Sequence, residues 1–151
     1  MRKIAIVFGM VLSVFMIGCS GTRPTNIGIN NGSLSPCPSK PNCITSQAAD
    51  EEHFSESFQY SVDKSVALNI LKKIILSQPR TKIVSETDNY LYAEYTTACF
   101  RFVDDVEFYF PENEQVVHFR SASRLGHSDL GVNKKRIESI RLLFTEMLND
   151  K

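Results

Sequence analysis

The sequence lacks an excess of either charge. Its 151 residues contain 17 lysines and arginines and 17 aspartates and glutamates. If residues 1–18 are removed, two basic residues are lost and no acidic ones, which leaves 17 − 2 = 15 basic side chains against 17 acidic ones. Nucleic-acid-binding domains carry a strongly basic surface. The composition therefore excludes a typical nucleic-acid-binding protein.

The motifs of common enzymes and metal sites are also missing. The serines between residues 120 and 129 lack a GxSxG context, and no lysine and hydroxyl follow Gly126 and Gly131 as a phosphate loop requires. Cys99 is not part of a CxxC pair, and its apolar neighbours predict a buried thiol. The histidines stand in no nucleophile or metal motif, and His53 is expected at the surface. The sequence predicts no metal, no cofactor and no evident catalytic machinery.

The first eighteen residues contain the chain's one long apolar run. Two basic residues precede it, and the run of about 15 residues is shorter than the ~20 that a membrane-spanning helix needs. A basic start, a short apolar core and small residues at its end are typical of a secretory signal peptide. The ending "MIGC" resembles the bacterial lipobox, which predicts cleavage after residue 18 and acylation (palmitate among the chains) of Cys19. An uncleaved signal anchor is the alternative.

The predicted lipid anchor implies a location in the cell envelope. Ser20 carries no aspartate-type retention signal, which favours the outer membrane, with the protein facing the periplasm. The membrane is then a partner through the acyl chains on Cys19. Residues 19–35 are small and polar with a single charge, and we expect a flexible tether that separates the anchor from one domain over residues 36–151.

Cys37 and Cys43 lie close together in "CPSKPNC". In an oxidising periplasm they are natural disulfide partners, because the prolines between them favour a turn. A metal site is the alternative, although no histidine or further cysteine stands nearby.

Hydrophobic periodicity predicts two helices and several strands. Alternation from Phe54 to Tyr60 indicates a first strand, and helical spacing from Ala67 to Ile75 indicates a helix that ends before Pro79. Further strands are expected in "RTKIVSET", "YLYAEYTTACF", "FRFVDDVEFYF" and "VVHFRSAS". A final helix, capped by Asn133, would bury Ile137, Ile140, Phe144 and Met147. The pattern predicts a single α+β domain with an antiparallel meander of about four to five strands and both helices on one face.

Asp104 interrupts an apolar strand face. Counting from Phe100, the even positions to Phe110 are apolar except for Asp104, whereas Asp105 and Glu107 point the other way. A lone carboxylate on a core face is costly, so Asp104 needs a cation or several donors. Arg136, in the first turn of the last helix, and the arginines of the preceding strand are the available partners.

Three interpretations of this charged corner compete. One is a buried ion-pair network that only holds the domain together. The second is a binding site for an anionic or polar ligand, formed by the arginines and the amides at the start of the last helix. The third is a hydrolase with Asp104, Asp105 or Glu107 as acid and base, although adjacent aspartates on opposite faces cannot easily act as a dyad.

Three motifs resemble one protein family. "PCPSKPNCITSQ", "FRFVDDVEF" and "RSASRLGHSDLGVNKKRI" together resemble the bacterial and plastid family catalogued as domain of unknown function 1499, over about residues 34–148. The resemblance implies an envelope lipoprotein or a small membrane-associated protein and names no activity. The family motif positions correspond to Cys37, Pro41, Asn42, Cys43, Ser46, Phe102, Asp104, Asp105, Glu107, Arg120, Ser121, Ser123, Arg124, Gly126, Asp129, Gly131, Asn133 and Arg136.

These observations favour a lipoprotein whose domain is a binding or structural module. We expect the cysteine turn, the acidic strand and the arginine loop to form one polar pocket for a small anionic or polar ligand. Its residues would be Asp104, Asp105, Arg120, Ser121, Ser123, Arg124, Asp129, Asn133 and Arg136. The alternative is a hydrolase that uses Asp104 or Glu107.

Overall fold

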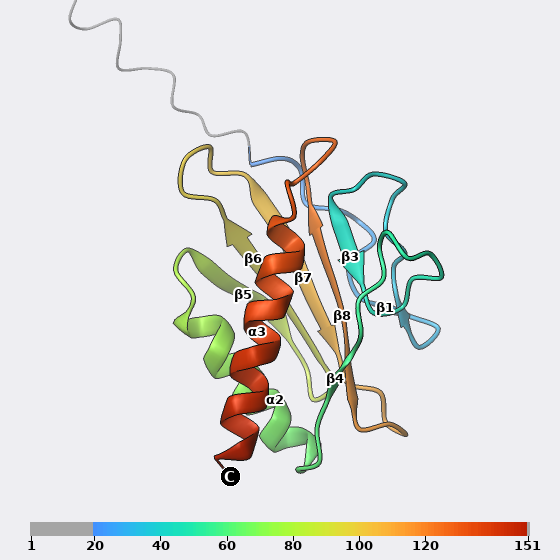
Figure 1. Cartoon of the computed structure of the whole chain (residues 1–151), viewed down its shortest axis with the longest axis vertical. Coiled ribbons are helices and arrows are strands. Elements are labelled where there is room, and N and C mark those ends of the chain that lie inside the picture. The colour runs from blue at the N-terminus through green and yellow to red at the C-terminus, as the bar shows by residue number, and fades with distance from the viewer. Residues whose placement is uncertain (1–19, 151) are drawn as a thin grey trace, which may run out of the picture.

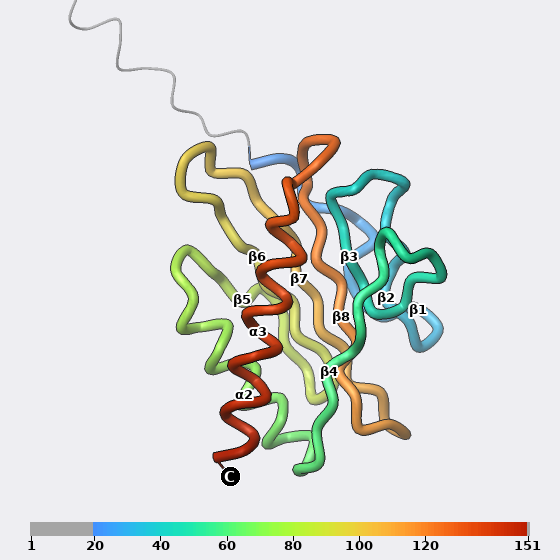
Figure 2. The backbone as a smooth tube through the Cα atoms, in the orientation of Figure 1, coloured from blue at the N-terminus to red at the C-terminus, as the bar shows by residue number. Residues whose placement is uncertain are grey.

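A computed structural model describes residues 20–150 of the chain (Figures 1 and 2). The predicted signal peptide, residues 1–18, and the acylation site Cys19 lie outside these residues. Two helices cover one face of an antiparallel sheet (Figure 1). The α+β class, the single domain and the placement of the helices agree with the prediction from sequence.

The main sheet has six strands. Its order is β3–β8–β7–β6–β5, and the short β4 also pairs with β8. The strands are β3 (Cys43–Thr45), β4 (Phe58–Gln59), β5 (Thr81–Glu86), β6 (Tyr90–Thr96), β7 (Val103–Tyr109) and β8 (Val116–Ser123). The last four form the predicted meander. The predicted first strand is shorter than expected, and β3 was not predicted.

The helices bury the apolar faces that their periodicity predicts. Helix α2 (Lys64–Ser77) buries Ala67, Ile70, Leu71, Ile74 and Ile75, and also Leu68. Helix α3 (Val132–Asn149) buries Ile137, Ile140 and Phe144. These side chains pack on Val106, Phe108, Phe110 and Phe119 of the sheet and form the main core. At roughly 1.5–3 kcal/mol for each fully buried large apolar side chain, this layer is the main source of stability.

The predicted strand "FRFVDDVEFYF" begins three residues late. Arg101 has a positive φ of 55°, which breaks the alternation, and β7 starts at Val103. Phe102 donates its amide to the Thr97 hydroxyl and so closes the β6–β7 loop. Phe100 and Phe102 were expected on the core face; instead they are exposed by 69% and 39%.

The segment expected as a tether packs on the sheet face opposite to the helices. It contains a small hairpin, β1 (Ile29–Asn30) with β2 (Ser33–Leu34). Leu34 is buried against Tyr90, Tyr92 and Tyr109. Figure 2 shows the path of this segment, in blue, from the upper end of the sheet to the hairpin. Sheet residues on both faces are therefore covered, and every residue of β7 is buried. The polar segment of low complexity is therefore part of the folded domain and not a flexible tether.

Among residues 20–150 the cysteines form one disulfide. Cys37 and Cys43 are bonded, as predicted, with Cα atoms 5.6 Å apart. The turn that they close leads directly into β3, which pairs with the end of β8. Cys99 was expected to be buried; it is an exposed free thiol in the β6–β7 loop, since β6 ends at Thr96. Among the described residues, no helix has the length and apolar character to cross a bilayer.

Two histidines have opposite environments. His53 is buried, not at the surface as expected; its Nδ1 lies 2.6 Å from the Asp50 carboxylate and its Nε2 3.2 Å from the Lys40 carbonyl. Burial alone would lower the pKa of His53, but Asp50 and the Lys40 carbonyl stabilise the imidazolium, and the pKa is raised. Burial lowers the pKa of His118, whose Nδ1 contacts the Ser46 hydroxyl.

Reduction of the disulfide is expected to lower stability. Closing so short a loop contributes about 2–3 kcal/mol, which corresponds to a fall in Tm of roughly 10 °C in a domain of this size. Thermal unfolding with and without dithiothreitol measures this fall. The Cys99→Ser variant keeps the disulfide, so its Tm should fall by the same amount on reduction. An unchanged Tm on reduction would contradict the structural role of the bond.

The pKa of His53 should lie above the ordinary value for histidine, and the pKa of His118 should lie below it. Proton NMR titration is expected to show His53 above about 6.5 and His118 below it. The contribution of His53 to stability is complete below the unfolded pKa and is lost as pH rises through the raised pKa. The contribution of neutral His118 is lost as pH falls through the lowered pKa. His53→Gln and His118→Gln assign the signals, and equal pKa values would contradict the two environments.

Candidate functional site

Strand β7 divides the predicted pocket between the two faces of the sheet. Asp104 points toward the helices, as strand parity predicts, whereas Asp105 and Glu107 point toward the N-terminal segment. The neighbouring strand β8 follows the same alternation: Arg120 and Arg124 face the N-terminal segment, and Ser121 faces α3. The expected residues therefore form two clusters, not one pocket.

Arg124 is the centre of the cluster under the N-terminal segment. Its Nε donates to Asp105 at 2.9 Å, and its Nη2 donates to Asp105 at 2.7 Å, to the Tyr92 hydroxyl at 3.2 Å and to Glu94. Arg23 of the N-terminal segment also donates to Glu94, through Nε at 2.9 Å. Two strands, β6 and β7, thus supply the anions, while β8 and the N-terminal segment supply the cations.

Glu107 extends this cluster along the same face. Its side chain is fully buried and accepts hydrogen bonds from the Tyr90 hydroxyl at 2.8 Å and the Gly28 amide at 2.7 Å. Arg120 Nη1 lies 3.3 Å from its other oxygen, and Arg120 Nε has no partner among the described residues. A buried carboxylate with a cation and two donors is compensated, as buried charges require.

Glu94 and Arg124 hold each other in ionised form. Burial by itself would raise the pKa of Glu94, but the guanidinium groups of Arg124 and Arg23 lower it below its usual range. The hydrogen bond to Asp105 raises the pKa of Arg124 above its usual value, against the effect of burial. Burial and the Asp105 carboxylate raise the pKa of Tyr92, so its hydroxyl remains a donor. Glu94, Arg124 and Tyr92 therefore keep their ordinary protonation states near neutral pH.

Asp104 belongs to a second cluster, on the helix face. Arg136 of α3 donates Nη2 to Asp104 and Nη1 to Ser121 and Asn133. The side-chain amide of Asn133 donates to the Ser123 hydroxyl at 3.0 Å and to the Asn42 carbonyl at 3.1 Å. The cysteine turn is therefore linked to Asp104 through Asn133 and Arg136, but the three motifs do not form the single pocket that we expected.

The start of α3 is already occupied by an anion of the chain itself. Asn133 was expected to cap this helix, but the helix begins at Val132 and Asn133 is buried in its first turn. Asp129 accepts the amides of Asn133 at 2.7 Å and Gly131 at 3.0 Å. Because the Asp129 carboxylate fills this position, the helix amides do not offer the expected anion site.

The carboxylates of β7 are therefore committed to arginines. Asp104, Asp105 and Glu107 are each buried and each accepts a hydrogen bond from a guanidinium. A general acid or base must reach a substrate in an open cleft. Asp104 lines a cleft formed by residues 97–132, but its side chain is bound by Arg136. No observation favours the hydrolase interpretation.

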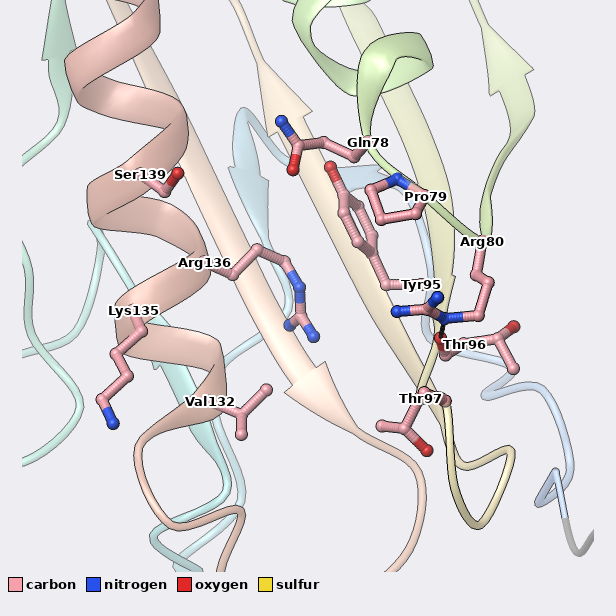
Figure 3. Close-up of a pocket in the computed structure, with 11 residues that line it drawn as sticks. Gln78, Pro79, Arg80, Tyr95, Thr96, Thr97, Val132, Lys135, Arg136 and Ser139 are labelled. Carbon is pink, nitrogen blue, oxygen red and sulfur yellow. Dashed lines mark hydrogen bonds between the residues drawn. The ribbon is translucent and has the colours of Figure 1, made fainter.

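A polar groove lies between the start of α3 and the ends of α2 and β6. It has a volume of about 460 Å³ and contains three cationic side chains, those of Arg80, Lys135 and Arg136, and no carboxylate. We call it the anion groove; its lining residues are Gln78, Pro79, Arg80, Tyr95, Thr96, Thr97, Ala98, Val132, Lys135, Arg136 and Ser139. Figure 3 shows the guanidinium groups of Arg80 and Arg136 directed into the space between α3 and β6, whereas Lys135 is turned away.

Several donors in the anion groove remain available. A guanidinium has five N–H groups; Arg136 uses three on Asp104, Ser121 and Asn133, and Arg80 uses its Nε on the Thr96 carbonyl at 3.2 Å. The Tyr95 hydroxyl is buried without a hydrogen-bond partner among the described residues. Burial raises its pKa to about 12, an effect that the charge of Arg136 partly offsets. The Arg136 guanidinium lies over the Tyr95 ring, 4.7 Å from its centroid.

Of the residues expected at a ligand site, only Arg136 lines the anion groove. Asp104, Ser123 and Asp129 line a neighbouring apolar cleft, and Asp105, Arg120, Ser121, Arg124 and Asn133 serve the buried clusters. Sequence analysis missed Arg80, Tyr95 and Lys135, because none stands in a motif. Strand parity could have placed Tyr95 opposite Asp104, its register partner in β7. Residues 20–150 contain no cluster of three or more metal-ligating side chains.

A protein family described as "Protein of unknown function (DUF1499)" matches residues 33–144. A search of the curated proteins and a search of the solved structures each gave no match. The matched range includes every strand of the main sheet, α2 and most of α3, and it excludes Arg23 and Gly28 of the N-terminal segment.

Arg124→Ala is expected to destabilise the domain severely. The change leaves Asp105 buried without its cation and Glu94 with only the exposed Arg23, which costs about 3–5 kcal/mol. Urea unfolding measures the loss. Lys73→Ala, which removes an exposed cation from α2, should change stability by less than about 0.5 kcal/mol. If Arg124→Ala unfolds at the wild-type urea concentration, the network has no structural role.

Proposed function

We propose that this chain, which belongs to the DUF1499 family, is an envelope lipoprotein whose domain binds a small anionic ligand in the anion groove. The family description assigns no activity, so the proposal is based on this chain alone. Its location would be the periplasmic side of the outer membrane, with acyl chains on Cys19.

The sequence pattern at the N-terminus supports the anchor. A basic start, a short apolar run and the ending "MIGC" precede Ser20. The protein would then be held at the membrane by its modified N-terminus. The disulfide between Cys37 and Cys43 is consistent with an oxidising compartment.

The observation that carries the ligand proposal is the composition of the anion groove. Two guanidinium groups converge on a space of about 460 Å³ that no carboxylate lines. Arg136 is already paired with Asp104 behind the groove, whereas Arg80 has no carboxylate partner among the described residues and donates only to the Thr96 carbonyl. The buried guanidinium groups of Arg120 and Arg124, in contrast to that of Arg80, are each paired with an acid. Unused N–H groups of Arg80 and Arg136 are suited to bidentate recognition of a phosphate or carboxylate.

The second feature is the rigidity of Arg136. Its contacts with Asp104, Ser121 and Asn133 fix the guanidinium before any ligand arrives. A ligand that meets a fixed donor loses less free energy to side-chain ordering. Tyr95 also lines the groove, and the raised pKa of its buried hydroxyl keeps the proton in place.

Arg80→Gln is expected to weaken anion binding about tenfold, because a charge-assisted hydrogen bond contributes roughly 1.5–3 kcal/mol. Isothermal titration with inorganic phosphate measures the affinity. Arg80 is exposed, so the variant should keep the wild-type Tm. Lys73→Gln removes the same charge from α2 outside the groove and should bind phosphate as wild type does. If wild type binds no phosphate, or if both variants lose affinity equally, the groove is not the site.

A further inference from the structure

One end of the domain exposes a cluster of large apolar side chains. Nine large hydrophobic residues are exposed among residues 20–150, and five of them line a single cleft of about 360 Å³. Leu130 is exposed by 87% and Phe100 by 69%. We call this surface the apolar end; its residues are Phe100, Phe102, Leu125, Leu130 and Val132.

The local backbone keeps these side chains in solvent. Arg101 and Leu130 both have φ values of 55°, in the left-handed region that disfavours residues other than glycine. The rings of Phe100 and Phe102 stack on each other with centroids 5.6 Å apart. A strained backbone that holds Leu130 outward points to a function for the exposed side chain, and clustered apolar exposure is typical of an interaction surface.

The chain enters the domain at this same end. In Figure 1 the described part of the chain begins, in blue, at the upper end of the sheet, where the β6–β7 and β8–α3 loops also lie. Gly21 packs so closely on the end of β8 that an added Cβ would lie 2.9 Å from the Arg124 Cβ and 3.1 Å from the Leu125 Cγ. Cys19 immediately precedes Ser20, and one residue spans at most about 3.5 Å. An anchor on Cys19 thus leaves almost no chain between the bilayer and the apolar end.

We propose that the apolar end inserts into the surface of the bilayer that carries the Cys19 anchor, so that the sheet stands end-on to the membrane. This inference rests on the proposed lipid anchor. Exposed Arg101, Lys134 and Lys135 neighbour the apolar residues in sequence and are suited to contact anionic headgroups. Apolar side chains at an interface reach roughly 5–10 Å below the headgroups.

The orientation also affects the anion groove. The groove shares Thr97 and Val132 with the apolar cleft, so both are at the same end of the domain. With the apolar end in the bilayer, the groove lies beside the headgroup layer. The anion that it meets at highest local concentration is then the phosphate of a phospholipid.

The absence of tryptophan makes the orientation measurable. Leu130→Trp introduces the sole indole of the chain at the apolar end, and Leu142→Trp introduces it on α3 at an exposed position outside the cleft. Each full-length variant, acylated in cells, is reconstituted in phosphatidylethanolamine and phosphatidylglycerol vesicles. The indole at 130 should shift to shorter emission wavelength and lose most of its emission to lipids brominated on their acyl chains. The indole at 142 should do neither.

Flotation of the same vesicles separates the two proposals. If the chain floats and the indoles at 130 and 142 are quenched equally, the lipid anchor stands and the inserted orientation is wrong. A blue shift at 130 without quenching means that another protein copy covers the apolar end, which also overturns the inference. A chain that does not float contradicts the anchor, and the orientation falls with it. Phe100→Trp repeats the test if Leu130→Trp does not fold.

Discussion

The pairing of the β7 carboxylates with arginines is the constraint on which the rest of the structure depends. β7 is buried on both faces and carries Asp104, Asp105 and Glu107 within four consecutive residues. An unpaired carboxylate there would be far too costly. Each acid therefore determines where a cation must lie: Arg136 on α3 for Asp104, Arg124 on β8 for Asp105, and Arg120 for Glu107. The register of β8 and the position of α3 follow from these pairs.

The same constraint explains why the N-terminal segment is part of the fold. Glu107 and Glu94 both need donors on a face that no helix covers. Gly28 and Arg23 supply them from the N-terminal segment. Leu34 of the same segment packs on Tyr90, Tyr92 and Tyr109 beside them. A polar, low-complexity segment thus packs because the acids beneath it need hydrogen bonds. Its own side chains supply little apolar area.

Sequence periodicity predicted the elements whose stability comes from apolar burial. Helices α2 and α3 and the meander β5–β8 follow their patterns, and strand parity placed Asp104 on the helix face with Arg136 as a partner. Predictions from periodicity were wrong where polar contacts or the backbone conformation determine the structure. The positive φ at Arg101 put Phe100 and Phe102 in solvent, Asp129 in place of Asn133 holds the start of α3, and His53 is buried by its bonds to Asp50 and Lys40. The anion groove could not be predicted from the sequence, because Arg80, Tyr95 and Arg136 come together only after three distant elements pack.

The packed N-terminal segment has a consequence for the order of folding. Its bonds join residues far apart in sequence: Gly28 is 79 positions from Glu107, and Arg23 is 71 from Glu94. Loop closure over such distances is slow compared with the formation of the local meander. We therefore expect this N-terminal segment to be among the last to dock, and until it does, Glu107 and Tyr90 remain hydrated on an open sheet face. We expect the chain to fold in two stages, in which the helix-covered sheet forms first and its polar cover docks second.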